Sequence, residues 1–183
     1  MKRIMRYLRG TSDYALCYDG SSELNLAGYS DADYAGDLDE SRSTSGFAFL
    51  LANGIVSWRS RKQTCVATST MEAEFVALSD TAKEAVWLKR LIDALLDSQD
   101  KTWPVRVYTD SQSALAATKE HKYHRRVKHI DVKYNHGRIM VKDKLMELEY
   151  VRTDKMLADP MTKPLHRVAF KAHVESMGLR KIV

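Results

Sequence analysis

Four acidic residues in distant parts of the chain are the candidates for chemistry, and two of them follow predicted strands. Asp110 directly follows the β-rich run 105–109, and Asp31 follows a predicted strand at 24–29, with Asp33 close behind it as an auxiliary candidate. In open α/β sheets, ligands bind at the carboxyl ends of strands. Both residues also have ordinary alternatives, because Asp110 could cap a helix that opens at Ser111 and Asp31 could belong to a polar turn.

Glu74 is the most informative acid because of its place on a predicted helix. At roughly 100° per residue, Glu74 shares a face with the apolar residues that must pack on a sheet. These residues are Leu78, Ala85, Leu88 and Ile92. A lone carboxylate on such a face is costly unless a cation pairs with it, so we interpret Glu74 as functional. Glu72 points about 160° away and completes a capping box that begins at Ser69, so we interpret Glu72 as structural.

Asp159 lies in an otherwise apolar turn over residues 155–163, where it is either a fourth ligand or a helix N-cap. Composition does not choose between the two. If Asp31, Glu74, Asp110 and Asp159 converge, their oxygens form a site of the type that Mg²⁺ or Mn²⁺ prefers. Two such ions roughly 4 Å apart activate water in phosphodiester cleavage. Without cations the carboxylates would repel one another, so the sequence predicts two bound divalent ions.

The predicted secondary structure places these acids on an α/β fold. The predicted strands are 24–29, 46–51, 55–66, 105–109 and 146–151. The predicted helices are 69–96, 111–118, 127–141 and a last one from residue 155, cut by Pro160 and Pro164. Asn53-Gly54 is a hairpin signal, so the first three strands should be antiparallel, and strands joined through helices should be parallel. We therefore expect a five-stranded mixed sheet flanked by helices.

Composition limits the class of protein. The chain of 183 residues is 44% hydrophobic, with 8 Gly and 3 Pro, which predicts a folded domain. Two cysteines cannot build a disulfide framework, and no apolar run is long enough for a membrane helix. We expect a cytoplasmic protein that is neither secreted nor membrane-bound, with a virus-like particle or the nucleus as alternative locations.

The positive charge is concentrated in one window, residues 121–138. It holds six basic residues and the single acid Asp131, a net 6 − 1 = +5, which equals the net charge of the whole chain. The six are Lys122, Arg125, Arg126, Lys128, Lys133 and Arg138. Such a patch either faces a polyanion or is a solvated helix face. Four histidines in the window lack a nearby cysteine and a common zinc spacing, so we do not expect zinc.

We name as candidate substrate-binding residues those that could contact a nucleic-acid backbone through cations or hydroxyls. They are Arg42, Thr44, Ser45, Ser111, Arg125, Arg126 and Lys128.

Five motifs, in chain order, resemble the ribonuclease H region of copia-type retrotransposon Pol proteins. They are Tyr29-Ser-Asp-Ala-Asp33, Ser69-Thr-Met-Glu-Ala-Glu-Phe-Val-Ala77, Tyr108-Thr-Asp-Ser-Gln-Ser-Ala114, Lys128-His-Ile-Asp131 and Ala158-Asp-Pro-Met-Thr-Lys-Pro164. The opening segment 2–11 resembles the connection between reverse transcriptase and that region. The resemblance spans nearly the whole chain.

The resemblance implies a ribonuclease H-like fold and a catalytic quartet of Asp31, Glu74, Asp110 and Asp159. It implies metal-dependent cleavage of the RNA strand of RNA/DNA hybrids, which leaves a 3′-hydroxyl and a 5′-phosphate. It also implies the polyprotein's reverse transcriptase domain as a partner, and a catalytic histidine, for which His129 is favoured over His124 and His136.

The resemblance also suggests how the chain is divided. We expect a connection tail at 1–20, the ribonuclease H domain at 21–165 and a helical tail at 166–183. Because no polymerase, protease or integrase zinc motif is found, a fragment of a polyprotein is expected. Two other classes stay open: a catalytically decayed nucleic-acid-binding relic, and an integrase or transposase. Enzymes of the latter class usually place Glu last, whereas Glu74 is second.

Overall fold

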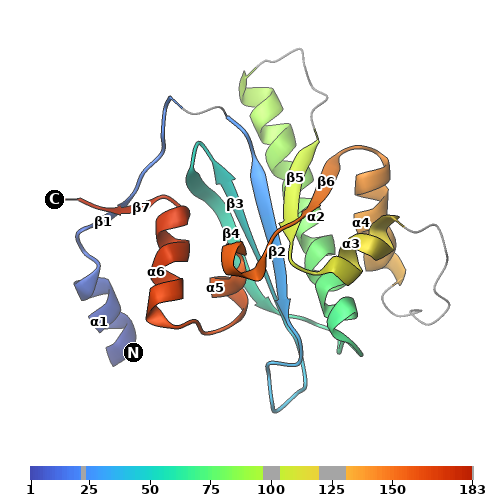
Figure 1. Cartoon of the computed structure of the whole chain (residues 1–183), viewed down its shortest axis with the longest axis horizontal. Coiled ribbons are helices and arrows are strands. Elements are labelled where there is room, and N and C mark those ends of the chain that lie inside the picture. The colour runs from blue at the N-terminus through green and yellow to red at the C-terminus, as the bar shows by residue number, and fades with distance from the viewer. Residues whose placement is uncertain (22–23, 97–103, 120–130, 183) are drawn as a thin grey trace.

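A five-stranded mixed sheet forms the centre of the computed structural model, which describes residues 1–21, 24–96, 104–119 and 131–182 (Figure 1). Its order is β4-β3-β2-β5-β6. The strands are β2 (Ala27–Asp33), β3 (Thr44–Leu51), β4 (Gly54–Lys62), β5 (Val105–Thr109) and β6 (Met146–Tyr150). The pairs β2/β3 and β3/β4 are antiparallel, and β2/β5 and β5/β6 are parallel. The predicted fold class is confirmed.

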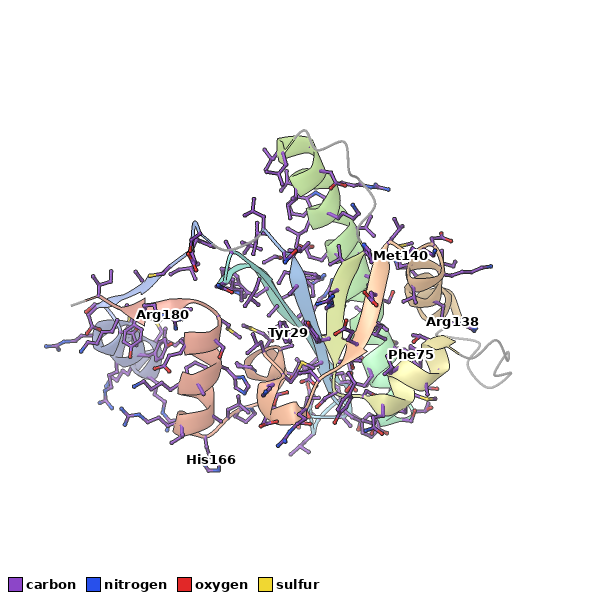
Figure 2. The ribbon with its side chains drawn as sticks, turned by 45° about the horizontal axis from the view of Figure 1, so that its top comes forward. Tyr29, Phe75, Arg138, Met140, His166 and Arg180 are labelled. Carbon is purple, nitrogen blue, oxygen red and sulfur yellow. The ribbon has the colours of Figure 1, made fainter. Side chains whose placement is uncertain are left out.

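Helices cover both faces of this sheet. On one face lies the long helix α2 (Thr70–Leu96), with α3 (Gln112–Lys119) and α4 (Asp131–Lys142) beside it. On the other face lie the short helix α5 (Asp159–Thr162), which follows the 3-10 turn η1 (Thr153–Lys155), and then α6 (Arg167–Ser176). Phe75 on α2 belongs to the larger core under the first face, while Tyr29 packs against the smaller core under the second (Figure 2). None of the described helices is long and apolar enough to cross a lipid bilayer.

The start of α2 follows the predicted capping box, with one shift. The Glu72 backbone N–H donates to Ser69 Oγ at 3.2 Å, as predicted. The Glu72 carboxylate, however, reaches one residue further back and accepts hydrogen bonds from the N–H and the hydroxyl of Thr68, at 2.6 and 2.7 Å. These bonds use the free N–H groups at the helix start and keep Glu72 in a structural role.

The β3–β4 turn lies one residue earlier than predicted. Ala52 and Asn53 both have positive φ, and Gly54 is already the first residue of β4, paired with Leu51. Gly54 is needed for close packing, because a Cβ there would come within 2.6 Å of the Tyr18 ring.

Strand β2 extends further than the sequence predicts. Asp31 and Asp33 lie inside the strand, where Asp31 pairs with Gly46 and Asp33 with Thr44, so the expectation that Asp31 follows the strand is wrong. Aspartate is unfavourable in strands, but the hydrogen-bonded ladder with β3 continues past it. The tertiary pairing outweighs the local preference here.

The two ends of the described chain meet in a small second sheet that the sequence did not predict. β1 (Tyr14–Leu16) pairs antiparallel with β7 (Leu179–Lys181). Next to it, Tyr7 of α1 (Lys2–Gly10) makes an edge-to-face ring contact with Phe170 of α6, at 6.3 Å between centroids. The segments expected to form separate tails therefore contact each other (Figure 1).

Candidate active site

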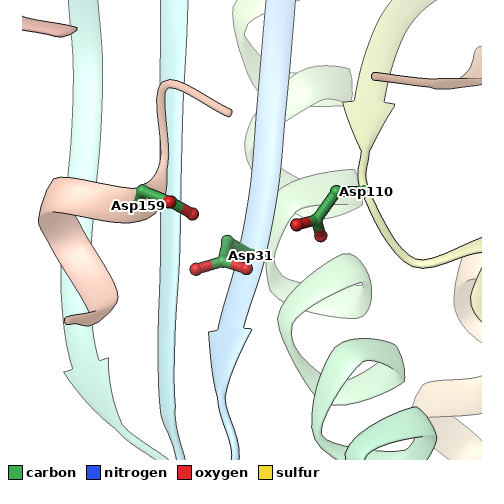
Figure 3. A group of neighbouring side chains, drawn as sticks. All are labelled: Asp31, Asp110 and Asp159. Atoms are coloured by element: carbon green, nitrogen blue, oxygen red, sulfur yellow. The ribbon is translucent and has the colours of Figure 1, made fainter. Parts of the chain in front are cut away.

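Three aspartates from different elements converge at one edge of the central sheet (Figure 3). Carboxylate oxygens of Asp31 in β2, Asp110 after β5 and Asp159 in α5 all lie within 4.8 Å of one another. The parallel pairing explains the first two, because Tyr29 is aligned with Tyr108 and each aspartate stands two residues further along its chain. Side chains two positions apart on a strand share a face.

Asp159 reaches the other two aspartates because α5 packs directly on β3. Gly46, the β3 partner of Asp31, lies under α5, and a Cβ there would stand 2.7 Å from Thr162 Cγ2 and 2.8 Å from Met161 Cβ. Such distances are shorter than carbon atoms tolerate. The absence of a side chain at this position therefore lets α5 approach the sheet closely enough for Asp159 to reach Asp31.

We predict that Gly46→Ala weakens metal binding at this edge. The added methyl group must push α5 outward, which should destabilise the fold by about 1–3 kcal/mol and lower the affinity for Mn²⁺ roughly tenfold. Calorimetric titration and thermal melting would measure the two effects. Gly137→Ala in α4 is the matched control, since its Cβ would meet only Leu78, at an ordinary 3.7 Å. Equal Mn²⁺ affinity in both variants would contradict this account of Gly46.

Asp31 is buried, and its protonation reflects that burial. Burial raises the pKa of Asp31 to about 6, although a hydrogen bond from Thr162 works in the opposite direction. Thr162 Oγ1 donates to Asp31 Oδ2 and also lies 3.1 Å from the Asp159 carbonyl oxygen. The hydroxyl of Thr162 thereby fixes the orientation of Asp31 relative to α5.

Glu74 stands beside this group on the α2 side, although it is not one of the three converging carboxylates. It is 6% exposed, and burial together with the charges of Asp31 and Asp110 raises its pKa to about 9. Its carboxyl group accepts a hydrogen bond from the Ala32 backbone. The apolar residues on its helix face are buried as predicted. Glu74 is therefore a buried carboxyl group whose ionisation is energetically unfavourable, as its helical spacing with apolar residues indicated.

Asp159 supplies the observation that tests whether a metal fits. Its Oδ1 atom is buried, and among the described residues the ammonium group of Lys163 forms an ion pair with it at 3.0 Å. Oxygens that share one divalent ion lie roughly 3–4 Å apart, close to the spread seen here. One ammonium group does not balance three carboxylates this close together, and the remaining negative charge fits a divalent cation.

The structure also decides between the ordinary alternatives. The α3 helix is capped by Ser111, whose Oγ accepts a hydrogen bond from the Ala114 N–H at 3.2 Å, so Asp110 is not the cap. Asp110 Oδ2 instead accepts a hydrogen bond from Thr153 Oγ1 at 2.7 Å. Asp159 is the first residue of α5, which has no side-chain cap. Asp33 is not part of the converging group.

Among the candidate substrate-binding residues, Ser45 and Ser111 have structural partners. Ser45 is buried, and its Oγ accepts a hydrogen bond from Gln63 Nε2 at 2.8 Å, so its hydroxyl is not presented to solvent. Arg42 is partly exposed and pairs with Glu40 at 3.3 Å, and Thr44 is partly exposed. Three further substrate-binding candidates, Arg125, Arg126 and Lys128, lie outside the described residues, as does the candidate catalytic histidine, His129.

Within the described part of the chain, Thr153, Thr162 and Lys163 contact the three converging aspartates, and sequence reasoning did not identify them. Thr162 and Lys163 lie within the motif 158–164, so the sequence already indicated that they are close to Asp159. Which atoms they contact depends on how α5 docks on the sheet, and the sequence alone does not specify that docking.

Sequence comparison relates the chain to polyproteins of plant transposons. It is 44% identical over 179 residues to the retrovirus-related Pol polyprotein from transposon TNT 1-94 of Nicotiana tabacum, which covers 98% of this chain and 13% of that protein. It is 36% identical over 182 residues to that from transposon RE2 of Arabidopsis thaliana, covering 100% of this chain and 12% of that one. The chain thus spans about an eighth of the relatives it matches. No protein-family model matches it.

Structural comparison identifies the fold. The N-terminal RNase H domain of a Mycobacterium tuberculosis protein matches with a TM-score of 0.52 at 13% identity, covering 84% of this chain and 99% of that one. An RNase H1 isolated from compost, solved in complex with an RNA/DNA hybrid, matches with a TM-score of 0.51 at 17% identity, covering 75% and 94%. The chain therefore belongs to the Pol polyproteins of copia-type retrotransposons, of which it matches one segment, and that segment has the ribonuclease H fold.

Proposed function

We propose that this chain is a ribonuclease H that hydrolyses the RNA strand of RNA/DNA hybrids, with two Mg²⁺ or Mn²⁺ ions held by Asp31, Glu74, Asp110 and Asp159. The convergence of the Asp31, Asp110 and Asp159 carboxylates within 4.8 Å carries the proposal. Two findings support it: the fold is that of RNase H proteins, one of which was solved with a hybrid, and the homologous polyproteins come from transposons.

The reaction class follows from what these residues can hold. When bound, divalent cations activate water and stabilise the negative charge that develops in phosphodiester cleavage. The attack of water on phosphorus forms one P–O bond and breaks the bond to the 3′ oxygen, which leaves a 3′-hydroxyl and a 5′-phosphate. The chain's own part is to fix the oxygen ligands: Thr162 orients Asp31 and Thr153 orients Asp110 through hydrogen bonds. Such preorganisation is a large part of catalysis in this class.

Protons must leave the site before cations can bind. Because burial and neighbouring charges raise the pKa of Glu74 to about 9, its carboxyl group is protonated at neutral pH in the absence of cations. A ligating carboxylate is deprotonated, so metal binding releases protons. We therefore assign Glu74 the role of a ligand that ionises on metal binding.

Substrate contacts and partners complete the proposal. Arg42 and Thr44, together with Arg125, Arg126 and Lys128, would contact the phosphate backbone of the hybrid, and Ser45 and Ser111 would support the loops beside them. His129 would assist proton transfer or product release. We also propose the division into 1–20, 21–165 and 166–183, the reverse transcriptase domain as the partner, and a cytoplasmic location.

A cleavage assay tests the activity. The full chain should be incubated with a hybrid labelled on the RNA strand, with double-stranded DNA and with double-stranded RNA, each in Mg²⁺ or in EDTA. We expect RNA cleavage only in the hybrid and only with Mg²⁺, with 3′-hydroxyl ends. The decayed-relic alternative predicts salt-sensitive hybrid binding without cleavage. Strand joining of DNA would instead indicate an integrase or transposase.

A further inference from the structure

Lys163 follows α5 and turns its side chain back over that helix toward the carboxylates. Its backbone N–H donates to the Asp159 carbonyl oxygen at 3.1 Å, and its extended φ and ψ end the helix there. Its Nζ atom lies 3.0 Å from the buried Oδ1 of Asp159. The ammonium group therefore stands beside one of the three converging carboxylates.

The charge of Lys163 acts on most of the cluster. It pairs directly with Asp159, and carboxylate oxygens of Asp31 and Asp110 lie within 4.8 Å of an Asp159 oxygen. In the protein without bound cations, Lys163 thus partly neutralises a site that holds four carboxyl groups.

An ammonium group and a divalent cation cannot share Asp159 Oδ1, because two positive charges at such short range repel strongly. Lysine can leave, since it has a long flexible stem and the Lys163 side chain is 34% exposed, whereas that of Asp159 is 5% exposed. The ammonium group can therefore move to solvent while the carboxylate stays in place.

We propose that Lys163 is an exchangeable counterion, which stabilises the cation-free site through Asp159 and is displaced from it when a divalent cation binds. This proposal rests on the proposed function, because it requires that the site binds such cations. Lys163 is then a positioning residue that acts through Asp159 and sets how tightly the site holds its metal.

Lys163→Met, which keeps the stem and removes the charge, tests the exchange in the full chain. We expect it to bind Mn²⁺ about threefold to tenfold more tightly than wild type in calorimetric titrations, because a competing cation is gone. In EDTA it should melt about 2–4 °C lower, since the carboxylates lose their counterion, and saturating Mn²⁺ should close that gap. Lys163→Arg keeps the charge and should bind Mn²⁺ like wild type.

Lys171→Met in α6 is the matched control, because Lys171 forms an ion pair of the same spacing with Glu175, an exposed pair at 3.7 Å outside the carboxylate cluster. It should change neither the Mn²⁺ affinity nor the difference in melting temperature between EDTA and Mn²⁺. If wild type binds Mn²⁺ and cuts the hybrid while Lys163→Met binds Mn²⁺ no more tightly, the counterion proposal alone is overturned. If wild type binds no Mn²⁺, both the counterion proposal and the metal site of the proposed function are overturned.

Discussion

Replacing Asp110 by Asn should lower the rate of hybrid cleavage roughly a thousandfold or more while leaving the fold intact. The change removes one negative charge from the three converging aspartates, and losing about 4 kcal/mol of cation-dependent stabilisation gives this factor. The fold should survive because Asn has the same shape, its carbonyl oxygen can still accept the hydrogen bond from Thr153, and Asp110 does not cap α3. The rate on labelled hybrid and the thermal melt measure the two parts of the prediction.

The control for Asp110→Asn is another neutralised carboxylate. Asp154 is exposed and pairs with Arg152 at 3.0 Å, so Asp154→Asn makes the same change in total charge outside the cluster. It should cleave the hybrid at the wild-type rate. A folded Asp110→Asn protein that also cleaves at that rate would exclude Asp110 from the site.

Glu74→Gln should make the cation-free protein more stable at alkaline pH. The folded protein raises the pKa of Glu74 from 4.5 to about 9, so it binds a proton that the unfolded chain releases across that interval. Wild type must therefore lose stability as the pH rises from about 4.5 to about 9, by at most about 1.4 kcal/mol per pH unit. Glutamine does not ionise, so the variant lacks this loss. Urea unfolding in EDTA at a series of pH values measures the difference.

The advantage of Glu74→Gln should vanish near pH 4.5 and be greatest near pH 9. Added Mg²⁺ should stabilise wild type more than the variant, because a cation favours the ionised carboxylate that only wild type possesses. Glu72→Gln is the matched control on the same helix. Because the Glu72 carboxylate accepts two hydrogen bonds from Thr68, this change should destabilise the protein at pH 8. A Glu74→Gln protein less stable than wild type at pH 8 in EDTA would contradict the electrostatic interpretation.

These predictions depend on features that the sequence predicts unequally well. Glu74 was identified from helical spacing alone, because a carboxylate in phase with Leu78, Leu88 and Ile92 must be buried wherever the helix packs. Asp110 followed from its position after a short strand. For Asp31 the strand was predicted to end too early, since two aspartates are poor strand residues and only the pairing with β3 extends β2 through them.

Some contacts could not be predicted from local patterns. The pairing of β1 with β7 joins short strands near opposite ends of the chain, and three-residue strands have too few positions to show alternation. Gly46 lies under α5, and a side chain there would collide with Thr162 and Met161. The sequence showed that the residue is small, and only the packing of α5 showed why.

The sequence by itself predicted the order of strands and helices in the five-stranded domain, the buried face of α2 and four candidate acids, because periodicity and motif spacing are local properties of the chain. Tertiary structure decided which acids bring their carboxylate oxygens within 4.8 Å of one another. It also decided which hydroxyl groups orient Asp31 and Asp110 and which lysine stands beside Asp159. Those contacts join segments separated by up to 131 residues. They form only because the strand register and the packing of α5 on Gly46 set the distances between the contacting side chains.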